Sequence, residues 1–266
     1  MIAIDSTIQP GSRPARLRRV LLALMLISGA LPPRLRAAVE ATAVTAPAAA
    51  TNPRKFILDS DPAELKRYRE ANAKLGAPAP GENRVVFLGD SITDAWGKHF
   101  DLYFPGKPYV GRGISSETTQ QMLIRFRPDV IALQPKVVVI LAGTNDIAGN
   151  TGRSTPEMIH DNLVSMIDLA EFNHIKVVLV SVLPASDYWW SRGMEPAEKI
   201  VALNAWMKDY AAKRGLVYVD CHTPMADAQH GLKAEYSPDG VHPNPAGYAV
   251  MSPLVDVGIA QALHKN

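Results

Sequence analysis

The segment Lys136–Ala142 (KVVVILA), followed at once by GTND (143–146), decides how this chain folds. Its residues are apolar and mostly β-branched, with little alternation between apolar and polar positions. Such a run is typical of a strand that is covered on both faces inside a parallel sheet. The glycine and polar residues after it mark the carboxyl end of the strand. We therefore expect those polar side chains at the edge of the sheet where ligands bind in open α/β folds.

Similar segments lie on both sides of this one, and helix-like stretches separate them. The predicted strands are 84–89 (RVVFLG), 136–142, 176–182 and 216–220, with a weaker strand at 108–111. Amphipathic stretches indicate helices near 117–127, 155–172, 196–213 and 245–263, and the capping pattern DPAE (61–64) predicts another over 62–75. A TIM barrel would need eight strand–helix units, and only about five are found. The order predicts an open, doubly wound α/β sandwich with three layers.

The composition is that of an ordinary globular protein, with 266 residues of which 47% are hydrophobic and 20% charged. The formal net charge is +2, but residues 1–50 carry six basic and two acidic residues, so that residues 51–266 have a net charge of −2. Without a basic surplus, the folded part is not expected to bind nucleic acid. Cys221 is the single cysteine, which excludes an intrachain disulfide and a CxxC motif.

The N-terminal residues have the pattern of an export signal. Four arginines precede the uncharged run Val20–Leu31, which at 12 residues is too short to span a bilayer as a helix. We interpret 1–37 as a signal peptide, 38–52 as a low-complexity linker and 53–266 as one folded domain. The cleavage point stays open, because the pattern ATA at 41–43 also fits a cleavage site. We expect a periplasmic or secreted protein with no stable membrane span after cleavage, and an uncleaved anchor is the alternative.

Chemically distinctive residues follow the predicted strands. Ser91 comes directly after the strand at 84–89, and Asn145 follows the strand at 136–142. Asp239 and His242 are three residues apart, so the carboxylate can accept the Nδ1 proton of the imidazole and leave Nε2 as a base. A hydroxyl, an imidazole and a carboxylate are parts of an acyl-transfer site. Ser91 is thus the candidate nucleophile, His242 the base and Asp239 the acid that orients it.

Three hydrogen-bond donors can be expected to hold the oxyanion that forms in such a reaction. The Ser91 N–H lies where a strand gives way to a helix, and the N-terminus of a helix carries partial positive charge. Gly113 has no Cβ, so its N–H can approach a substrate closely. The side-chain amide of Asn145 can supply the third donor. We therefore predict an oxyanion hole made of Ser91, Gly113 and Asn145.

Four motifs resemble, in order, the four sequence blocks of the SGNH or GDSL hydrolase superfamily. They are GDSIT (89–93), the glycine within GRGI (111–114), GTND (143–146) and DGVH (239–242). The resemblance covers about residues 84–250 and implies a flavodoxin-like α/β/α fold, with the catalytic and oxyanion roles given above. Trp96 after GDSIT and the segment DGVHPNPAGY resemble most the branch of platelet-activating-factor acetylhydrolase subunits and bacterial carbohydrate acetylesterases. The segment GRG lacks the asparagine that members often carry near this glycine.

The segment DYWWSR (187–192) follows the fourth predicted strand and should lie over the site. Its aromatic residues Tyr188, Trp189 and Trp190 are candidate substrate-binding residues, because aromatic rings stack on sugar faces or line an acyl pocket. Packing of at least one of these rings beneath the loop is the alternative.

We therefore expect a serine ester hydrolase that cleaves carboxylic esters through an acyl-enzyme, with acetyl esters of carbohydrate as the favoured substrates. A lysophospholipase or thioesterase, or an acyltransferase of the same superfamily, is the alternative enzyme. A non-catalytic carbohydrate-binding module is the alternative class of protein. No cofactor is expected, and because the chain lacks HExxH and paired-His carboxylate motifs, no catalytic metal is expected either. The oligomeric state is left open.

Overall fold

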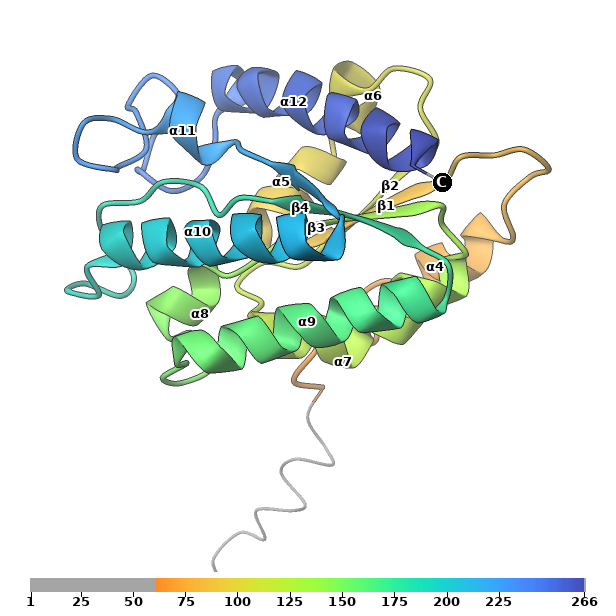
Figure 1. The fold of residues 1–266 in the computed structure, drawn as a ribbon, viewed down its shortest axis with the longest axis horizontal. Helices are drawn as coiled ribbons and strands as arrows, with labels where there is room; N and C mark the ends of the chain where they lie inside the picture. Colours follow the sequence, from red (N-terminus) through yellow and green to blue (C-terminus); the bar gives the residue numbers. More distant parts are fainter. Residues whose placement is uncertain (1–60, 266) are drawn as a thin grey trace, which may run out of the picture. The chain divides into compact units, whose positions relative to one another are not determined.

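The computed structural model describes residues 61–265, and the predicted signal peptide (1–37) and linker (38–52) lie outside these residues. Its centre is one sheet of five parallel strands in the order β2-β1-β3-β4-β5. The strands are β1 (Val85–Gly89), β2 (Tyr109–Gly113), β3 (Val137–Leu141), β4 (Lys176–Val180) and β5 (Val217–Val219). The predicted parallel sheet of about five strands is confirmed (Figure 1).

Helices cover both faces of the sheet and give the predicted three-layer α/β/α sandwich (Figure 1). One layer contains α5 (Ser91–Gly97), α6 (Phe100–Tyr103), α11 (His222–Met225) and α12 (Pro245–His264). The other layer contains α4 (Arg69–Leu75), α7 (Thr119–Asp129), η1 (Ile131–Leu133), α8 (Thr144–Ala148), α9 (Pro156–Phe172) and α10 (Pro196–Arg214). The alternating strand–helix order of the sequence therefore corresponds to a doubly wound sheet.

Successive residues of each strand enter two different cores. In β1, Val86 and Leu88 pack in the core beneath α7, α9 and α10, while Val85 and Phe87 pack in the core beneath α5, α6 and α12. All five residues of β1 are buried. Because both faces are covered, every position favours an apolar side chain, which explains why the strands show little alternation in sequence.

α12 has a length and a mean hydropathy that would also suit a membrane span. It is the single helix with this property within residues 61–265. In the fold it lies across β3, β4 and β5, and Gly258 lets the helix approach the sheet so closely that a Cβ there would collide with Val219. Its apolar side is therefore used in the core of the domain.

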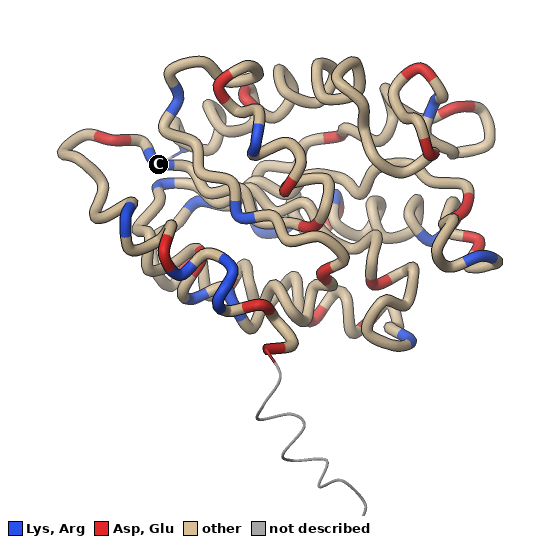
Figure 2. The backbone as a smooth tube through the Cα atoms, turned by 180° about the vertical axis from the view of Figure 1, so that it is seen from behind, with Lys and Arg blue, Asp and Glu red and all other residues tan. Residues whose placement is uncertain are grey.

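A buried ion cluster fastens the carboxyl end of β1. The Arg125 guanidinium is fully buried; its Nε donates to Glu117 Oε2 at 2.5 Å and its Nη2 donates to the carbonyl of Gly89 at 3.0 Å. A third bond joins Arg125 Nη1 to Asp129 at 3.2 Å. Because Gly89 lies two residues before Ser91, this cluster fixes the backbone from which the candidate nucleophile projects. Elsewhere, positive and negative residues are interspersed on both helical layers (Figure 2).

The structure differs from the sequence-based expectation at the start of the domain. The helix predicted over 62–75 begins only at Arg69. Residues before it form turns in which the Asp61 carboxylate accepts hydrogen bonds from the N–H groups of Leu65 and Lys66, and Glu64 has a left-handed φ of 46°. Asp61 therefore accepts backbone hydrogen bonds as a capping residue does, but these bonds stabilise a turn and not the start of a helix. The left-handed Glu64 cannot continue an α-helix. The short helices α6, α8 and α11 were not predicted.

Candidate active site

The structure brings the three predicted catalytic residues into one hydrogen-bonded chain. Ser91 is the first residue of α5, directly beyond β1, and its Oγ lies 2.9 Å from His242 Nε2. His242 Nδ1 lies 2.8 Å from Asp239 Oδ2. Ser91 and His242 are 151 residues apart in sequence, so the fold alone creates this arrangement. It places a hydroxyl, a proton acceptor and an orienting carboxylate in the order that nucleophilic catalysis requires.

The loop that carries Asp239 and His242 is organised by its own hydrogen bonds. Asp239 Oδ1 accepts the backbone N–H groups of Val241 and His242, and the Ser237 hydroxyl donates to the carbonyl of His242 at 2.8 Å. Burial raises the pKa of the Asp239 carboxyl, but the hydrogen bonds from His242 and Val241 outweigh this effect and lower the pKa to about 2. Asp239 therefore stays ionised and holds the proton of the imidazole on Nδ1, which leaves Nε2 to accept the serine proton.

Asn145 and Ser91 lie at the same edge of the sheet, because β1 and β3 are neighbours in register and each residue follows one of these strands. Gly89 pairs with Leu141, and both strands turn into short helices, so that the first residues of α5 and α8 meet at the carboxyl edge of the sheet. The buried Asn145 side chain donates one Nδ2 hydrogen to the carbonyl of Glu117 at 3.0 Å. An amide nitrogen has two hydrogens, so one remains to bind an oxyanion.

The structure corrects the interpretation of Gly113. Successive N–H groups of a strand point to opposite sides, and because Ile114 N–H donates to Gly89 of β1, Gly113 N–H points away from β1. The carbonyl of Gly113 accepts a hydrogen bond from the Tyr68 hydroxyl at this outer edge. A Cβ on Gly113 would collide with the backbone of Asp94 in α5. The glycine is needed for close packing of α5 against β2, and its N–H is not aimed at Ser91.

Ser116, three residues further along the chain, has an environment that suits the donor role expected of Gly113. It is exposed and has a left-handed φ of 67°. Its carbonyl accepts a hydrogen bond from Asn150, which also contacts Asn145. Within residues 61–265 no hydrogen-bond acceptor is found for the Ser116 N–H. Nothing in the sequence marks this residue clearly, because a left-handed position is usually occupied by glycine or asparagine and not by serine.

The three aromatic residues of the 187–192 loop have different environments. Tyr188 is fully buried and its hydroxyl lies 2.8 Å from Thr144 Oγ1, so its prediction as a substrate-binding residue is corrected: it anchors the loop to α8. The Trp190 ring lies 6.2 Å from the His242 ring, at the site. Trp189 is 60% exposed and packs edge-on against Trp190. Two of the three rings therefore remain available at the mouth of the site.

Two buried carboxylates lie under the site. Asp90 accepts the N–H of Ile92 and caps α5, and Asp146 accepts both the N–H and the hydroxyl of Thr119 at the start of α7. Burial raises the pKa of each carboxyl to about 6. Both residues therefore position the backbone around Ser91 and Asn145, at a site where ionised carboxylates are poorly solvated.

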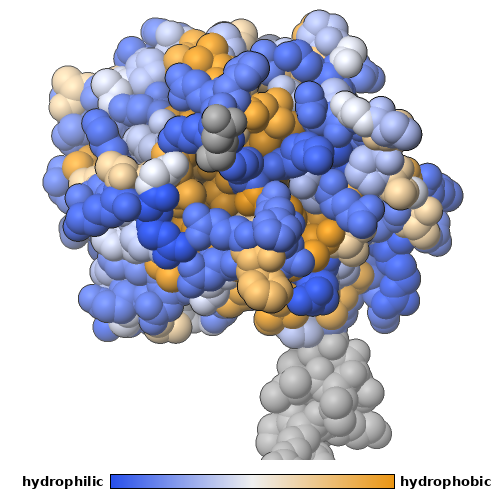
Figure 3. Space-filling view, turned by 45° about the vertical axis from the view of Figure 1, so that its right-hand side comes forward, coloured by the Kyte–Doolittle hydropathy of each residue, from blue (hydrophilic) through white to orange (hydrophobic). Residues whose placement is uncertain are grey.

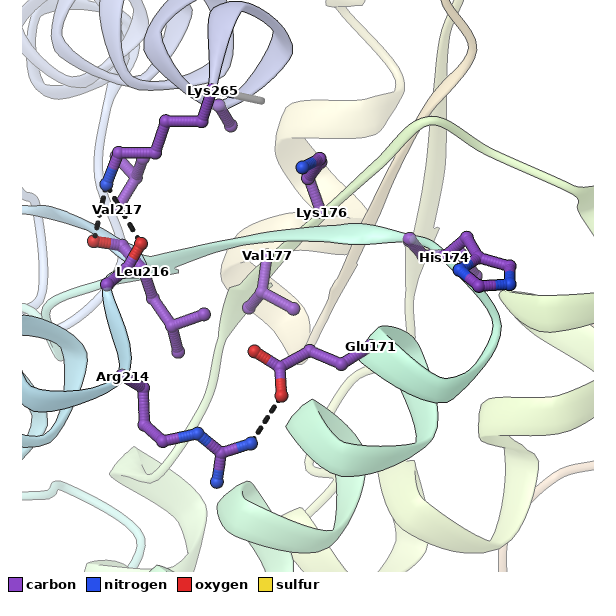
Figure 4. A pocket seen from close by; sticks show the side chains of 11 residues that line it. Glu171, His174, Lys176, Val177, Arg214, Leu216, Val217 and Lys265 are labelled. Atoms are coloured by element: carbon purple, nitrogen blue, oxygen red, sulfur yellow. Dashed lines mark hydrogen bonds and ion pairs between the residues drawn. The ribbon is translucent and has the colours of Figure 1, made fainter.

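The opposite edge of the sheet contains a hollow of about 490 Å³, lined by Val177, Leu216, Val217 and basic residues. Figure 3 shows apolar surface framed by hydrophilic residues on this side of the molecule. Figure 4 shows that Lys265 Nζ donates to the carbonyls of Gly215 and Leu216, and that Arg214 pairs with Glu171. The Lys265 and Arg214 side chains are thus occupied with protein partners, and none of the predicted site residues lines this hollow.

A parallel α/β/α sandwich with a Ser–His–Asp hydrogen-bond chain at its carboxyl edge has the arrangement of residues that serine hydrolases use. Residues 87–250 match the GDSL-like Lipase/Acylhydrolase family, and because this is more than half of the chain, the chain belongs to that family. The protein is therefore a hydrolase of the acylhydrolase type, as the sequence motifs predicted.

Individual relatives agree with this assignment. A GDSL-like lipase from Bacteroides thetaiotaomicron VPI-5482 is 44% identical, with a TM-score of 0.73 over 75% of this chain and 98% of that one. An inferred acylhydrolase from Bacteroides fragilis NCTC 9343 is 43% identical, with a TM-score of 0.75 over 77% of this chain and 100% of that one. The uncharacterised lipoprotein YqeF of Bacillus subtilis (strain 168) is 35% identical over 41% of this chain, and the matched region spans about half (52%) of its length.

An acetylxylan esterase from Geobacillus stearothermophilus shares the fold. It is 20% identical, with a TM-score of 0.56 over 70% of this chain and 97% of that one.

Within residues 61–265, no group of three or more His, Cys, Asp or Glu side chains is arranged to hold a metal ion.

Proposed function

We propose that the protein is a serine esterase that works through an acyl-enzyme at Ser91. The observation that carries this proposal is the continuous hydrogen-bond chain from Ser91 Oγ through His242 to Asp239. Ser91 Oγ attacks the ester carbonyl while His242 Nε2 takes the hydroxyl proton and then gives it to the departing alcohol. A water molecule, activated by the same nitrogen, hydrolyses the acyl-enzyme and regenerates the serine.

The oxyanion of the tetrahedral intermediate is held by three donors in this proposal. They are the N–H of Ser91 at the start of α5, the second Nδ2 hydrogen of Asn145 and the N–H of Ser116, which has no acceptor within the described residues 61–265. Ser116 replaces Gly113, whose N–H points to the outer edge of β2. Donors fixed in advance are effective because they need no reorganisation when the charge develops.

We propose short acyl esters, above all acetyl groups on carbohydrate, as the substrates. Support comes from the exposed ring of Trp189 and from Trp190 beside His242, because sugar rings stack on such surfaces. The acetylxylan esterase that shares the fold acts on an ester of this kind. For location we propose export from the cytoplasm, supported by the N-terminal pattern of arginines and apolar residues and by similarity to a lipoprotein.

Covalent labelling by a fluorophosphonate tests the nucleophile. We expect the wild-type protein to label at one site and Ser91→Ala not to label, with a fall in kcat of at least about 10⁴-fold on p-nitrophenyl acetate. A folded wild-type protein that does not label would contradict the proposal. A series of p-nitrophenyl esters from acetate to palmitate, together with acetylated xylan, tests the substrate, and a maximum at long chains would favour a lipase over an acetylesterase.

A further inference from the structure

Asn150 makes an unusual set of contacts for an exposed side chain. It lies one residue beyond the C-cap of α8, and its Nδ2 donates to Asn145 Oδ1 at 2.8 Å and to the carbonyl of Ser116 at 3.2 Å. Its Oδ1 accepts the indole N–H of Trp190 at 2.9 Å. Both hydrogens and the oxygen of this amide are therefore engaged, although the residue is exposed to solvent.

Together with the carbonyl of Glu117, these contacts determine which way the Asn145 amide points. An asparagine side chain can rotate to exchange its oxygen and nitrogen, and only its hydrogen-bond partners select one orientation. The indole N–H of Trp190 can only donate, so the Oδ1 of Asn150 must face Trp190. The Nδ2 of Asn150 then faces Asn145. Asn145 must then direct its oxygen to Asn150 and its Nδ2 to the carbonyl of Glu117, with its second hydrogen free.

The same side chain contacts the segment that contains the second donor. Ser116 has a left-handed φ of 67°, a conformation that is strained for a non-glycine residue and needs support from its surroundings. The bond from Asn150 to the carbonyl of Ser116 supplies such support. The exposed amide of Asn150 thus contacts both residues, Asn145 and Ser116, that carry the proposed oxyanion donors besides Ser91.

We infer that Asn150 is a positioning residue, which holds the amide of Asn145 and the backbone of Ser116 in the orientation that binds an oxyanion, and that Trp190 holds Asn150 in turn. This inference rests on the proposed function, because it assigns a role within the same site. Asn150 also connects Trp190, which lies beside His242, to the oxyanion donor Asn145 through two hydrogen bonds. A substrate that moves Trp190 will therefore affect the alignment of the donors.

The test compares kcat and KM of four variants on p-nitrophenyl acetate. Asn150→Ala should lower kcat by about tenfold with KM within about twofold, because the donors remain but are no longer held in place, and full removal of one donor has a larger effect. Asn150→Asp has the same shape and keeps the acceptor for Trp190, but it has no hydrogen to donate, so it should lower kcat at least as much. Trp190→Phe removes one hydrogen bond and should lower kcat by about threefold. Asn173→Ala removes a comparable side-chain bond at the distant end of α9 and serves as the matched control, with kcat unchanged.

A double mutant separates positioning from general damage to the fold. If Asn150 acts through Asn145, then Asn150→Ala should lower kcat by less than about threefold in the Asn145→Ala background. An equal fall in both backgrounds, or a kcat of Asn150→Asp within twofold of wild type, would overturn the inference. If the folded wild-type protein is not labelled by a fluorophosphonate, the proposed function itself is refuted. Failure of the inference and failure of the proposed function therefore give different results.

Discussion

The two edges of the sheet are both lined by polar side chains, yet the hydrogen-bonding states of these side chains differ. At the carboxyl edge, Asn145 keeps one free hydrogen and the Ser116 N–H has no partner within residues 61–265. At the opposite edge, Lys265 donates to two carbonyls and Arg214 pairs with both Asp168 and Glu171. Unused donors that are held in place, and not the presence of a hollow or of charge, therefore distinguish the candidate active site.

The pKa values of the two edges show the same contrast. Near the site, burial raises the pKa of the Asp90 carboxyl to about 6, so the protein stabilises its neutral form. At the opposite edge, hydrogen bonds from Arg214 to Asp168 and Glu171 raise the pKa of the guanidinium, so the protein stabilises its charged form. At the active-site edge an ionised carboxylate would thus be destabilised by burial, whereas at the opposite edge the charged group is stabilised by its partners. Destabilised charged groups are common where side chains are arranged for catalysis.

The largest effect that sharpens this contrast is expected from Asn145→Ala. This change removes a donor from the active-site edge, and we expect kcat to fall by about 10²–10³-fold with a small change in KM, because the lost bond forms mainly in the transition state. The measurement is the steady-state hydrolysis of p-nitrophenyl acetate. A kcat within threefold of wild type would remove Asn145 from the oxyanion hole.

A smaller effect is expected from Asp90→Asn, measured as the free energy of unfolding against pH. The pKa of Asp90 is raised from 3.8 to about 6 in the folded protein, so the neutral carboxyl favours folding and this contribution is lost as the pH rises through about 6. The amide keeps an oxygen to accept the N–H of Ile92 but never ionises. We expect the variant to gain about 1–3 kcal/mol over wild type between pH 4 and pH 7.

Asp101→Asn, at an exposed position of α6, is the control for this measurement. Its stability curve should run parallel to that of the wild type. If the curve of Asp90→Asn is also parallel, ionisation of Asp90 carries no penalty in the folded protein. Residual pH dependence is expected in either case, because burial also raises the pKa of Asp146.

The sequence was sufficient for the features that depend on repeated pattern or short spacing. Buried parallel strands are apolar along their whole length, and Asp239 and His242 meet because they are three residues apart in one loop. The position of Gly113 could not be predicted, because the direction of its N–H depends on which neighbour β2 pairs with. The sequence likewise could not show that Tyr188 is buried while Trp190 lies at the site. Whether a ring of this loop packs inward or outward depends on α8 and the residues after it, which the two side chains contact.

The smallest effect is expected at the opposite edge, where Lys265→Ala removes two hydrogen bonds to the carbonyls of Gly215 and Leu216 at the C-terminal end of α10. These bonds satisfy two carbonyls in the connection between α10 and β5, and water can partly replace the lysine because the contact is exposed. We expect the free energy of unfolding to fall by about 0.5–1 kcal/mol and kcat on p-nitrophenyl acetate to stay unchanged. Chemical denaturation and steady-state kinetics on one preparation provide both values. A fall in kcat would show that the two edges are coupled through the sheet, because Lys265 lies beyond the amino ends of β4 and β5 and contacts none of the residues assigned to the site.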